Sequence, residues 1–235
     1  MTLEVRAPKD WPEMLAFEGL QRDVWKCPDR EIVPAHQLQA HHHHGGCLLG
    51  LWQDGMAVGC CYAFPGPLGQ DYLYSHFAAI TPSLQGQGLG FLLKQAQADW
   101  ARERGYRRIV WTYDPLQAAN SRLNLGKLGA VCNRYRVDYY GELEDELNRG
   151  IPSDRLEVDW WLGPVQRFSP QQSLEFPCNL PWDERLHWRL QLRTQLQQAF
   201  AQGLAIVGFR IENGWGRYLL GDYLLEDGPG TPPSV

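Results

Sequence analysis

Long hydrophobic runs and an excess of positive charge are both missing from this sequence. No stretch approaches the roughly 18–20 consecutive apolar residues that cross a bilayer, so we expect no membrane-spanning helix. The 235 residues carry 22 Lys and Arg against 27 Asp and Glu, a net charge of −5. This balance argues against a nucleic-acid or membrane-surface partner. The first residues lack a basic segment followed by an apolar one, and we therefore expect a cytoplasmic protein.

The six cysteines include no C-x-x-C pair, which removes the usual signature of zinc ribbons and thioredoxin-like redox sites. Cys47, Cys60 and Cys61 stand in apolar runs and are expected to be small buried hydrophobic residues with reduced thiols. What the chain does have is aromatic residues, with ten Trp and ten Tyr. These predict a well-filled core and allow an aromatic-walled pocket.

The order of predicted elements indicates a mixed α/β (α+β) sheet within residues 1–163. Asp10 and Pro12 mark the start of a helix, and Asp54-Gly55 predicts a tight turn between two strands. Helices are expected at residues 10–25, 32–44, 89–104 and 116–126. Strands are expected at residues 3–6, 47–52, 56–64, 72–80, 109–113, 132–140 and 156–162.

Residues 164–235 are expected to form a C-terminal extension. Residues 164–181 show little periodicity and are expected to be a connector. It is followed by a helix at 183–202 and by two strands, 205–211 and 218–225, which a turn at Asn213-Gly214 joins. The Gly- and Pro-rich residues 228–233 are expected to be a frayed tail.

The most informative segment joins the strand at 72–80 to the next helix through Gln85-Gly86-Gln87-Gly88-Leu89-Gly90. Glycines bring backbone amides close to a ligand, and a helix N-terminus adds unpaired N–H donors and partial positive charge. The two features suit a pyrophosphate. No Lys-Ser/Thr pair follows, which excludes a P-loop, and the G-x-G-x-G spacing is not that of a dinucleotide fold. The alternative is a glycine turn that permits close helix–strand packing.

Together with the preceding strand, this loop resembles the acyl-CoA signature of the GCN5-related N-acetyltransferases (GNAT). The resembling residues read Ala78-x-Ile80-x-Pro82-x-x-Gln85-Gly86-Gln87-Gly88-Leu89-Gly90. A subgroup of predicted acetyltransferases in this superfamily also resembles the chain at Ser75-His76, Trp111–Leu116, Asn120, Asn124-Leu125, Lys127–Ala130, Tyr139–Gly141 and Pro152–Arg155, and in its C-terminal extension.

The resemblance implies the GNAT acyl-CoA N-acyltransferase fold with a C-terminal helix-plus-hairpin extension, and an acyl-CoA co-substrate. It places the CoA pyrophosphate on the backbone of Gln85, Gly86, Gln87, Gly88, Leu89 and Gly90. It places pantetheine along the backbone of Ala78, Ala79 and Ile80, where neighbouring strands diverge, and Asn120 near the cofactor. The acceptor it implies is the amine of a small molecule, such as an amino acid, and the acyl group is acetyl or succinyl.

Amide formation from a thioester needs a neutral amine, a stabilised carbonyl oxygen and a departing thiolate. Many family members carry a glutamate base on the strand that here reads Tyr72 to Ile80, and this chain has none. His76, which strand alternation places on the face of Ala78, is the candidate base or water-orienting residue. Its alternative is a core histidine bonded to backbone.

Two further roles remain open. The family's usual tyrosine acid is replaced by Leu125, so Tyr113, Tyr135, Tyr139 and Tyr140 are either substitutes or packing residues. Arg155 either binds a carboxylate of the acceptor or acyl group or pairs with Asp154 or Glu157.

The run His41–His44 resembles an affinity tag but lies inside the chain, where we expect a solvated helix end rather than a metal site. A non-catalytic CoA-binding sensor or assembly protein is the alternative function. A homodimer, built through the strands of the extension, is also expected.

Overall fold

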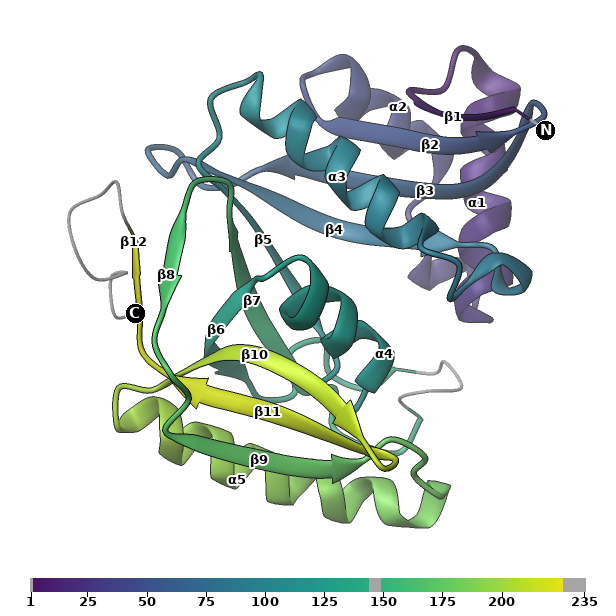
Figure 1. Cartoon of the computed structure of the whole chain (residues 1–235). Coiled ribbons are helices and arrows are strands. Elements are labelled where there is room, and N and C mark those ends of the chain that lie inside the picture. The colour runs from purple at the N-terminus through teal and green to yellow at the C-terminus, as the bar shows by residue number, and fades with distance from the viewer. Residues whose placement is uncertain (1, 144–148, 226–235) are drawn as a thin grey trace. The chain divides into compact units, whose positions relative to one another are not determined.

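The computed structural model describes residues 2–143 and 149–225, which pack as two compact units (Figure 1). Unit 1 holds described residues 2–111, 142–143 and 149–150, and unit 2 holds 112–141 and 151–225. The expected division at residues 163 and 164 stays a prediction, and the predicted tail lies outside the described residues. Across the described ranges, no helix is both long and apolar enough to cross a membrane.

Unit 1 is a sheet with helices on both faces, as the sequence pattern predicts. Its strands lie in the order β1-β2-β3-β4-β5, and all neighbours are antiparallel except β4 and β5. The elements are β1 (Leu3–Arg6), α1 (Trp11–Trp25), α2 (Ala35–His43), β2 (Cys47–Gln53), β3 (Met56–Pro65), β4 (Tyr72–Ile80), α3 (Leu89–Arg102) and β5 (Arg108–Tyr113), which continues into unit 2.

Local chemistry sets the boundaries of these elements. The Asp10 carboxylate accepts a hydrogen bond of 3.0 Å from the Glu13 amide, so Asp10 caps α1 as predicted. The predicted turn between β2 and β3 is also confirmed. Asp54 and Gly55 both take positive φ angles, 49° and 82°, the geometry that a two-residue hairpin favours.

The two faces of the unit 1 sheet carry separate hydrophobic clusters. Helices α1 and α2 pack on one face, where Phe17, Leu38, Trp52 and Tyr62 are almost fully buried. Helix α3 packs on the other face, where its Leu93 is buried with Leu51 and Cys61. Cys47, Cys60 and Cys61 are fully buried with free thiols, as expected from the sequence.

Strand β4 contains a bulge that changes which face its side chains occupy. Tyr62 lies opposite Phe77 and Ala63 lies opposite Ser75, so His76 is the extra residue. Consequently Ser75 lies on the α3 face, whereas His76 and Phe77 both lie on the α1 face. The prediction that His76 shares a face with Ala78 is wrong, because Ala78 pairs with Cys61 on the α3 face.

In unit 2 the strands of the sheet lie in the order β7-β6-β10-β11-β9. The predicted connector at 164–181 is wrong, since it contains strands β8 and β9. Strand β9 is short, pairs only with β11 and alternates polar and apolar residues, a weak signal in the sequence. The elements are α4 (Ala118–Ser121), a π-helical segment (Arg122–Lys127), β6 (Val131–Arg136), β7 (Arg155–Trp161), β8 (Val165–Arg167), β9 (Gln172–Pro177), α5 (Arg185–Ala201), β10 (Ala205–Glu212), β11 (Trp215–Gly221) and β12 (Tyr223–Leu225).

The predicted C-terminal helix and hairpin are present in unit 2. Residues Asn213 and Gly214 form the turn between β10 and β11, with φ angles of 51° and 81°. Strand β10 also pairs with β6 through Ile206 and Cys132, so the hairpin extends the unit 2 sheet. The last predicted strand ends early, at Gly221, and β12 pairs with β8 in a separate ribbon.

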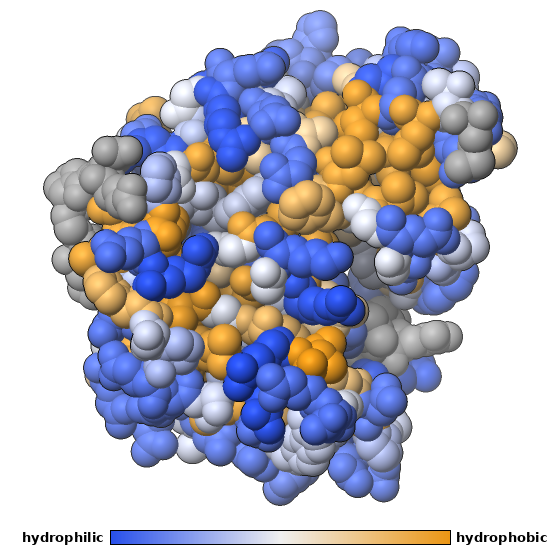
Figure 2. All heavy atoms as spheres, viewed as in Figure 1, coloured by the Kyte–Doolittle hydropathy of each residue, from blue (hydrophilic) through white to orange (hydrophobic). Residues whose placement is uncertain are grey.

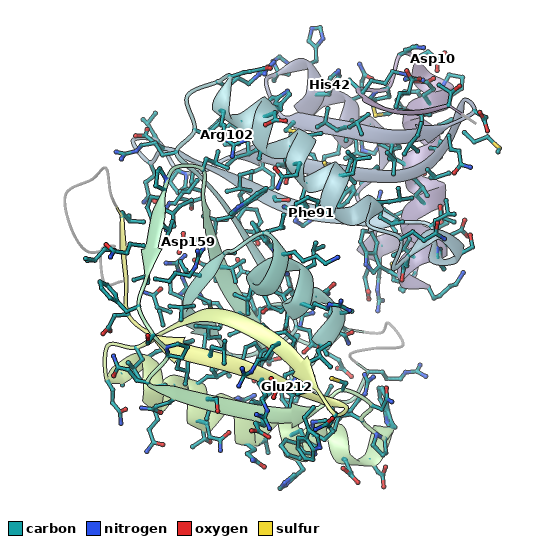
Figure 3. The ribbon with its side chains drawn as sticks, viewed as in Figure 1. Asp10, His42, Phe91, Arg102, Asp159 and Glu212 are labelled. Atoms are coloured by element: carbon teal, nitrogen blue, oxygen red, sulfur yellow. The ribbon has the colours of Figure 1, made fainter. Side chains whose placement is uncertain are left out.

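Several buried charges in unit 2 are paired with opposite charges. The fully buried Arg189 guanidinium lies 2.9 Å from the Asp114 carboxylate. Arg193 donates two hydrogen bonds of 2.8 Å to the buried Asp154 carboxylate. Arg134 lies 2.6 Å from the carboxylate of Asp159, which Figure 3 labels.

Candidate functional site

The glycine loop between β4 and α3 is open to solvent. Gln85, Gly86, Gln87 and Gly88 are all exposed. Gly86 and Gly88 take φ angles of +78° and +86°, and a Cβ atom at either position would meet nothing within 4 Å. The glycines are therefore required by backbone conformation rather than by close packing, which disfavours the alternative of a tight helix–strand contact.

The first turn of α3 offers unpaired backbone amides directly after the loop. The first hydrogen bond inside the helix joins the Leu92 amide to the Gly88 carbonyl at 3.1 Å. The amides of Leu89, Gly90 and Phe91 therefore have no partner within the helix, and the helix dipole adds partial positive charge there. Phe91 marks this end of α3 in Figure 3, and Arg102 marks the other. This arrangement can bind a diphosphate.

The side chains of the loop hold its shape. The Gln85 side-chain amide donates to the Ile80 carbonyl at 2.9 Å, and the Gln87 side-chain amide donates to the Ser83 carbonyl at 3.4 Å. Both glutamines thus bind the loop to the residues that precede it. Figure 2 shows hydrophobic side chains gathered around α3 on this face of unit 1, where Leu92 is exposed.

Strands β4 and β5 pair over only three residues each. The last parallel pair in the register is Tyr74 with Val110, and β4 continues for six more residues to Ile80. The expected divergence of the two strands is therefore present. It leaves the edge of β4 from Ser75 to Ile80, including Ala78 and Ala79, without a strand partner from β5 in unit 1.

His76, the predicted base, is exposed at the bulge and borders a cluster of rings. Its ring centroid lies 5.9 Å from that of Tyr62 and 6.2 Å from that of Phe64. Desolvation by these neighbours, together with the nearby His41, lowers the pKa of His76 from its usual value of 6.5. The imidazole is consequently neutral near pH 7, the form that accepts a proton.

The histidine run at the end of α2 is only partly a solvated helix end. His43 and His44 are exposed, as expected, but His41 stacks on Tyr62 with ring centroids 5.3 Å apart. The Nδ1 atom of His41 and the hydroxyl of Tyr62 are buried without a hydrogen-bond partner among the described residues. Sequence reasoning treated His41 together with the rest of the run and did not predict that it stacks on Tyr62.

A second group that sequence reasoning missed is Lys94 on α3. It is 4% exposed, and its ammonium lies 3.9 Å from the ring centroid of Trp111. It donates hydrogen bonds to the Ser75 hydroxyl at 3.1 Å and to the Gln97 side-chain carbonyl at 2.7 Å. Burial lowers its pKa from 10.5 to about 8. The visible signal was a lysine directly beside Leu93, on the buried face of the helix.

The remaining predicted site residues belong to unit 2. Asn120 is exposed on α4, and Leu125 is buried in the π-helical segment. Arg155 is buried, donates to the Asp154 carbonyl at 2.8 Å and lies over the Tyr140 ring. The predicted cofactor role of Asn120 and substrate role of Arg155 stay predictions.

The four tyrosines proposed as substitutes for an acid differ in their surroundings. Tyr113 is buried with its hydroxyl accepting a hydrogen bond from Ser121, and Tyr135 donates to the Asp154 carboxylate at 2.7 Å. Desolvation raises the pKa of both hydroxyls. Tyr139 and Tyr140 are exposed. Tyr113 and Tyr135 therefore fit the packing alternative best.

A surface cavity of about 580 Å³ lies elsewhere in unit 1, near Asp10 and His42, both labelled in Figure 3. Its lining contains no residue of β4 or of the glycine loop. The lining residues are Pro8, Lys9, Asp10, Trp11, Gln39, His42 and His43. Within residues 2–143 and 149–225, no three His, Cys, Asp or Glu side chains gather to hold a metal ion.

Comparison with known proteins agrees with this geometry. Residues 11–125 match the model of the acetyltransferase (GNAT) family. The match includes β4, the glycine loop, α3 and Asn120, and it ends before the strands and helix of the extension. No protein of curated function matches the sequence.

Solved structures share the fold at low sequence identity. The N-acetyltransferase from Staphylococcus aureus Mu50 has a TM-score of 0.57 and 16% identity, over 69% of this chain and 99% of that one. The ribosomal-protein-S18-alanine N-acetyltransferase from Escherichia coli has a TM-score of 0.55 and 16% identity, over 68% of this chain and 94% of that one. The yncA protein from Salmonella typhimurium, solved with acetyl-CoA, has a TM-score of 0.55 and 18% identity, over 70% of this chain and 96% of that one. At these identities the likeness establishes the fold alone.

Proposed function

We propose that the chain is an acyl-CoA-dependent N-acetyltransferase, as the match of residues 11–125 to the acetyltransferase (GNAT) family indicates, and that its acceptor is a small-molecule amine such as an amino acid. The acyl group transferred is acetyl or succinyl. The amine attacks the thioester directly while both substrates are bound.

The observation that carries this proposal is the open glycine loop ahead of α3. Gly86 and Gly88 expose backbone in left-handed conformations, and the amides that follow are unpaired. The loop from Gln85 to Gly90 therefore binds the CoA pyrophosphate. Pantetheine pairs with the free edge of β4 at Ala78, Ala79 and Ile80 and points its thioester towards the bulge.

The bulge supplies groups for the reaction. His76 is neutral near pH 7 and takes a proton from the attacking ammonium, directly or through water. A backbone amide near Ala78 stabilises the carbonyl oxygen as negative charge develops on it. The rings of Phe64 and Tyr62 beside His76 form an apolar wall against which an acceptor side chain packs.

The test uses the full-length protein with acetyl-CoA or succinyl-CoA and a panel of amino acids and small amines. We expect free thiol to appear with at least one acceptor, and mass spectrometry of the product to identify the acyl group. Mass spectrometry of any ligand that co-purifies gives an independent reading of the cofactor. If CoA binds, no acceptor releases thiol and His76→Ala changes nothing, the protein is a CoA-binding sensor or assembly protein instead.

A further inference from the structure

Lys94 is an unusual residue for the interior of unit 1. In the described part of that unit it is the one buried side chain among Asp, Glu, Lys and Arg. No carboxylate contacts its ammonium there. The neighbours that do are neutral: the Ser75 hydroxyl, the Gln97 side-chain carbonyl and the Trp111 ring.

Such a cation is costly to keep inside a protein, since burial removes its hydration and no opposite charge compensates. Gln97 adds a second unsatisfied group. Its side-chain carbonyl accepts from Lys94, but its amide nitrogen is buried without a hydrogen-bond partner among the described residues. A buried cation without a counter-charge, beside a buried amide without a partner, points to a polar group that comes from outside the chain.

The position of Lys94 indicates what that group is. Pairing of β4 with β5 ends at Tyr74 and Val110, and Ser75 and Trp111 are the next residue on each strand. The ammonium contacts both, so it lies where the strands begin to diverge. From Ile80, beside the glycine loop, to Ser75 is five strand residues, roughly 17 Å at 3.3 Å each. An extended pantetheine arm starting at the loop covers this length.

We propose that Lys94 is a catalytic residue that stabilises and protonates the departing CoA thiolate. The inference rests on the proposed function, because it needs CoA bound along β4. The acceptor nitrogen forms a bond to the carbonyl carbon, and the carbon–sulfur bond then breaks with its electron pair moving to sulfur. The Lys94 ammonium gives the sulfur a proton, the nitrogen, already deprotonated once by His76, loses a second proton to water, and solvent restores Lys94 and His76.

The groups facing Lys94 from each packed element allow this role. Besides Ser75, Gln97 and Trp111, these are the thiols of Cys47 on β2 and Cys61 on β3. A hydrogen bond with Cys61 and burial both raise the pKa of Cys47, which therefore stays a neutral thiol. The same hydrogen bond and the charge of Lys94 lower the pKa of Cys61. The pKa of Lys94, about 8, is close to that of an ordinary thiol, so proton transfer to sulfur is nearly balanced.

The test compares CoA with desulfo-CoA, which lacks the sulfur, by calorimetry on the full-length protein between pH 6.5 and 9.5. We expect wild type to prefer CoA by about 10-fold near pH 7 and to show the ultraviolet absorbance of a bound thiolate. Lys94→Met and Lys94→Gln should lose both the preference and the absorbance, bind desulfo-CoA as wild type does, and lower kcat about 100-fold. Cys61→Ala, the matched control, should keep the preference.

Four results would overturn the assignment. If both Lys94 variants keep the preference for CoA, Lys94 does not contact the sulfur, and the proposed function is unaffected. Loss of the preference in Cys61→Ala as well assigns it to the thiol. If the Lys94 variants change only the choice between succinyl-CoA and acetyl-CoA, Lys94 binds the carboxylate of the acyl group instead of the sulfur. Failure of wild type to bind either ligand refutes the proposed function itself, and this inference with it.

Discussion

The two units of the molecule treat a buried cation in opposite ways. In unit 2 the fully buried Arg189 faces the Asp114 carboxylate at 2.9 Å and also donates to the Asp154 carbonyl at 3.0 Å. In unit 1 the buried Lys94 meets only neutral acceptors and an aromatic ring. A compensated charge fixes a structure, whereas an uncompensated one is held ready for a partner. Unit 2 is therefore built for stability at this point and unit 1 for chemistry.

The largest effect is expected from removing the compensation in unit 2. Asp114→Asn leaves Arg189 buried without its counter-charge and should lower the free energy of unfolding by about 3–5 kcal/mol. Denaturant titration measures this. The control is Asp99→Asn, which breaks the exposed pair with Arg102 and should cost at most about 1 kcal/mol. Similar losses in the two variants would show that Arg189 does not depend on its carboxylate.

The pH dependence of stability should separate the units next. Folding lowers the pKa of Lys94 from 10.5 to about 8, so the loss of stability caused by burying the charged ammonium is complete below pH 8. Between pH 8 and 10.5 the unfolded chain holds the extra proton, and stability rises by about 3 kcal/mol across that window. Lys94→Met should remove this rise and be the more stable protein at pH 7. Parallel curves for the two proteins would contradict the uncompensated charge.

The third effect concerns the exposed histidine of unit 1. The pKa of His76 lies below 6.5, so kcat/KM should rise through that region as His76 loses its proton. His76→Gln should abolish this acidic limb and reduce kcat/KM about 100-fold. His43→Gln is the matched control, because His43 is exposed on α2 and should leave the profile unchanged. An intact limb in His76→Gln would assign the base to another group.

The smallest effect compares one glycine from each unit. Gly88 and Gly203 have nearly equal φ angles, +86° and +85°, and open space around the absent Cβ. Alanine at either position should therefore cost about 1–2 kcal/mol of stability. Only Gly88→Ala should also weaken CoA binding, measured by calorimetry. Equal affinity in both variants would remove the loop from the cofactor site.

The sequence predicted the parts of the fold that depend on local signals. The cap at Asp10, the turns at Asp54-Gly55 and Asn213-Gly214 and the glycine loop all follow from residues within a few positions of one another. They are confirmed because nothing distant has to be known. The loop lies between β4 and α3, as predicted, and the candidate site built on it stays a prediction.

What could not be predicted depends on contacts between distant residues. The bulge at His76 exists through the register of β4 against β3, which no single strand reveals. The buried face of α3 holds Lys94 and Gln97, although the apolar residues alone suggested a face containing Leu92, which is exposed. The charge of Lys94 in a core follows from what surrounds it rather than from its spacing.

The bulge in β4 also means that residues at odd positions of this one strand lie on both faces of the sheet. Ser75, before the bulge, contacts α3, and Phe77 and Ala79, after it, pack with α1, although all three occupy odd positions. Deleting the single codon for His76 would restore plain alternation and keep Ser75 on the α3 face and Phe77 and Ala79 on the α1 face. A one-residue gap at His76 would thus leave the linings of both cores unchanged, whereas the same gap elsewhere in β4 would move residues to the opposite face of the sheet.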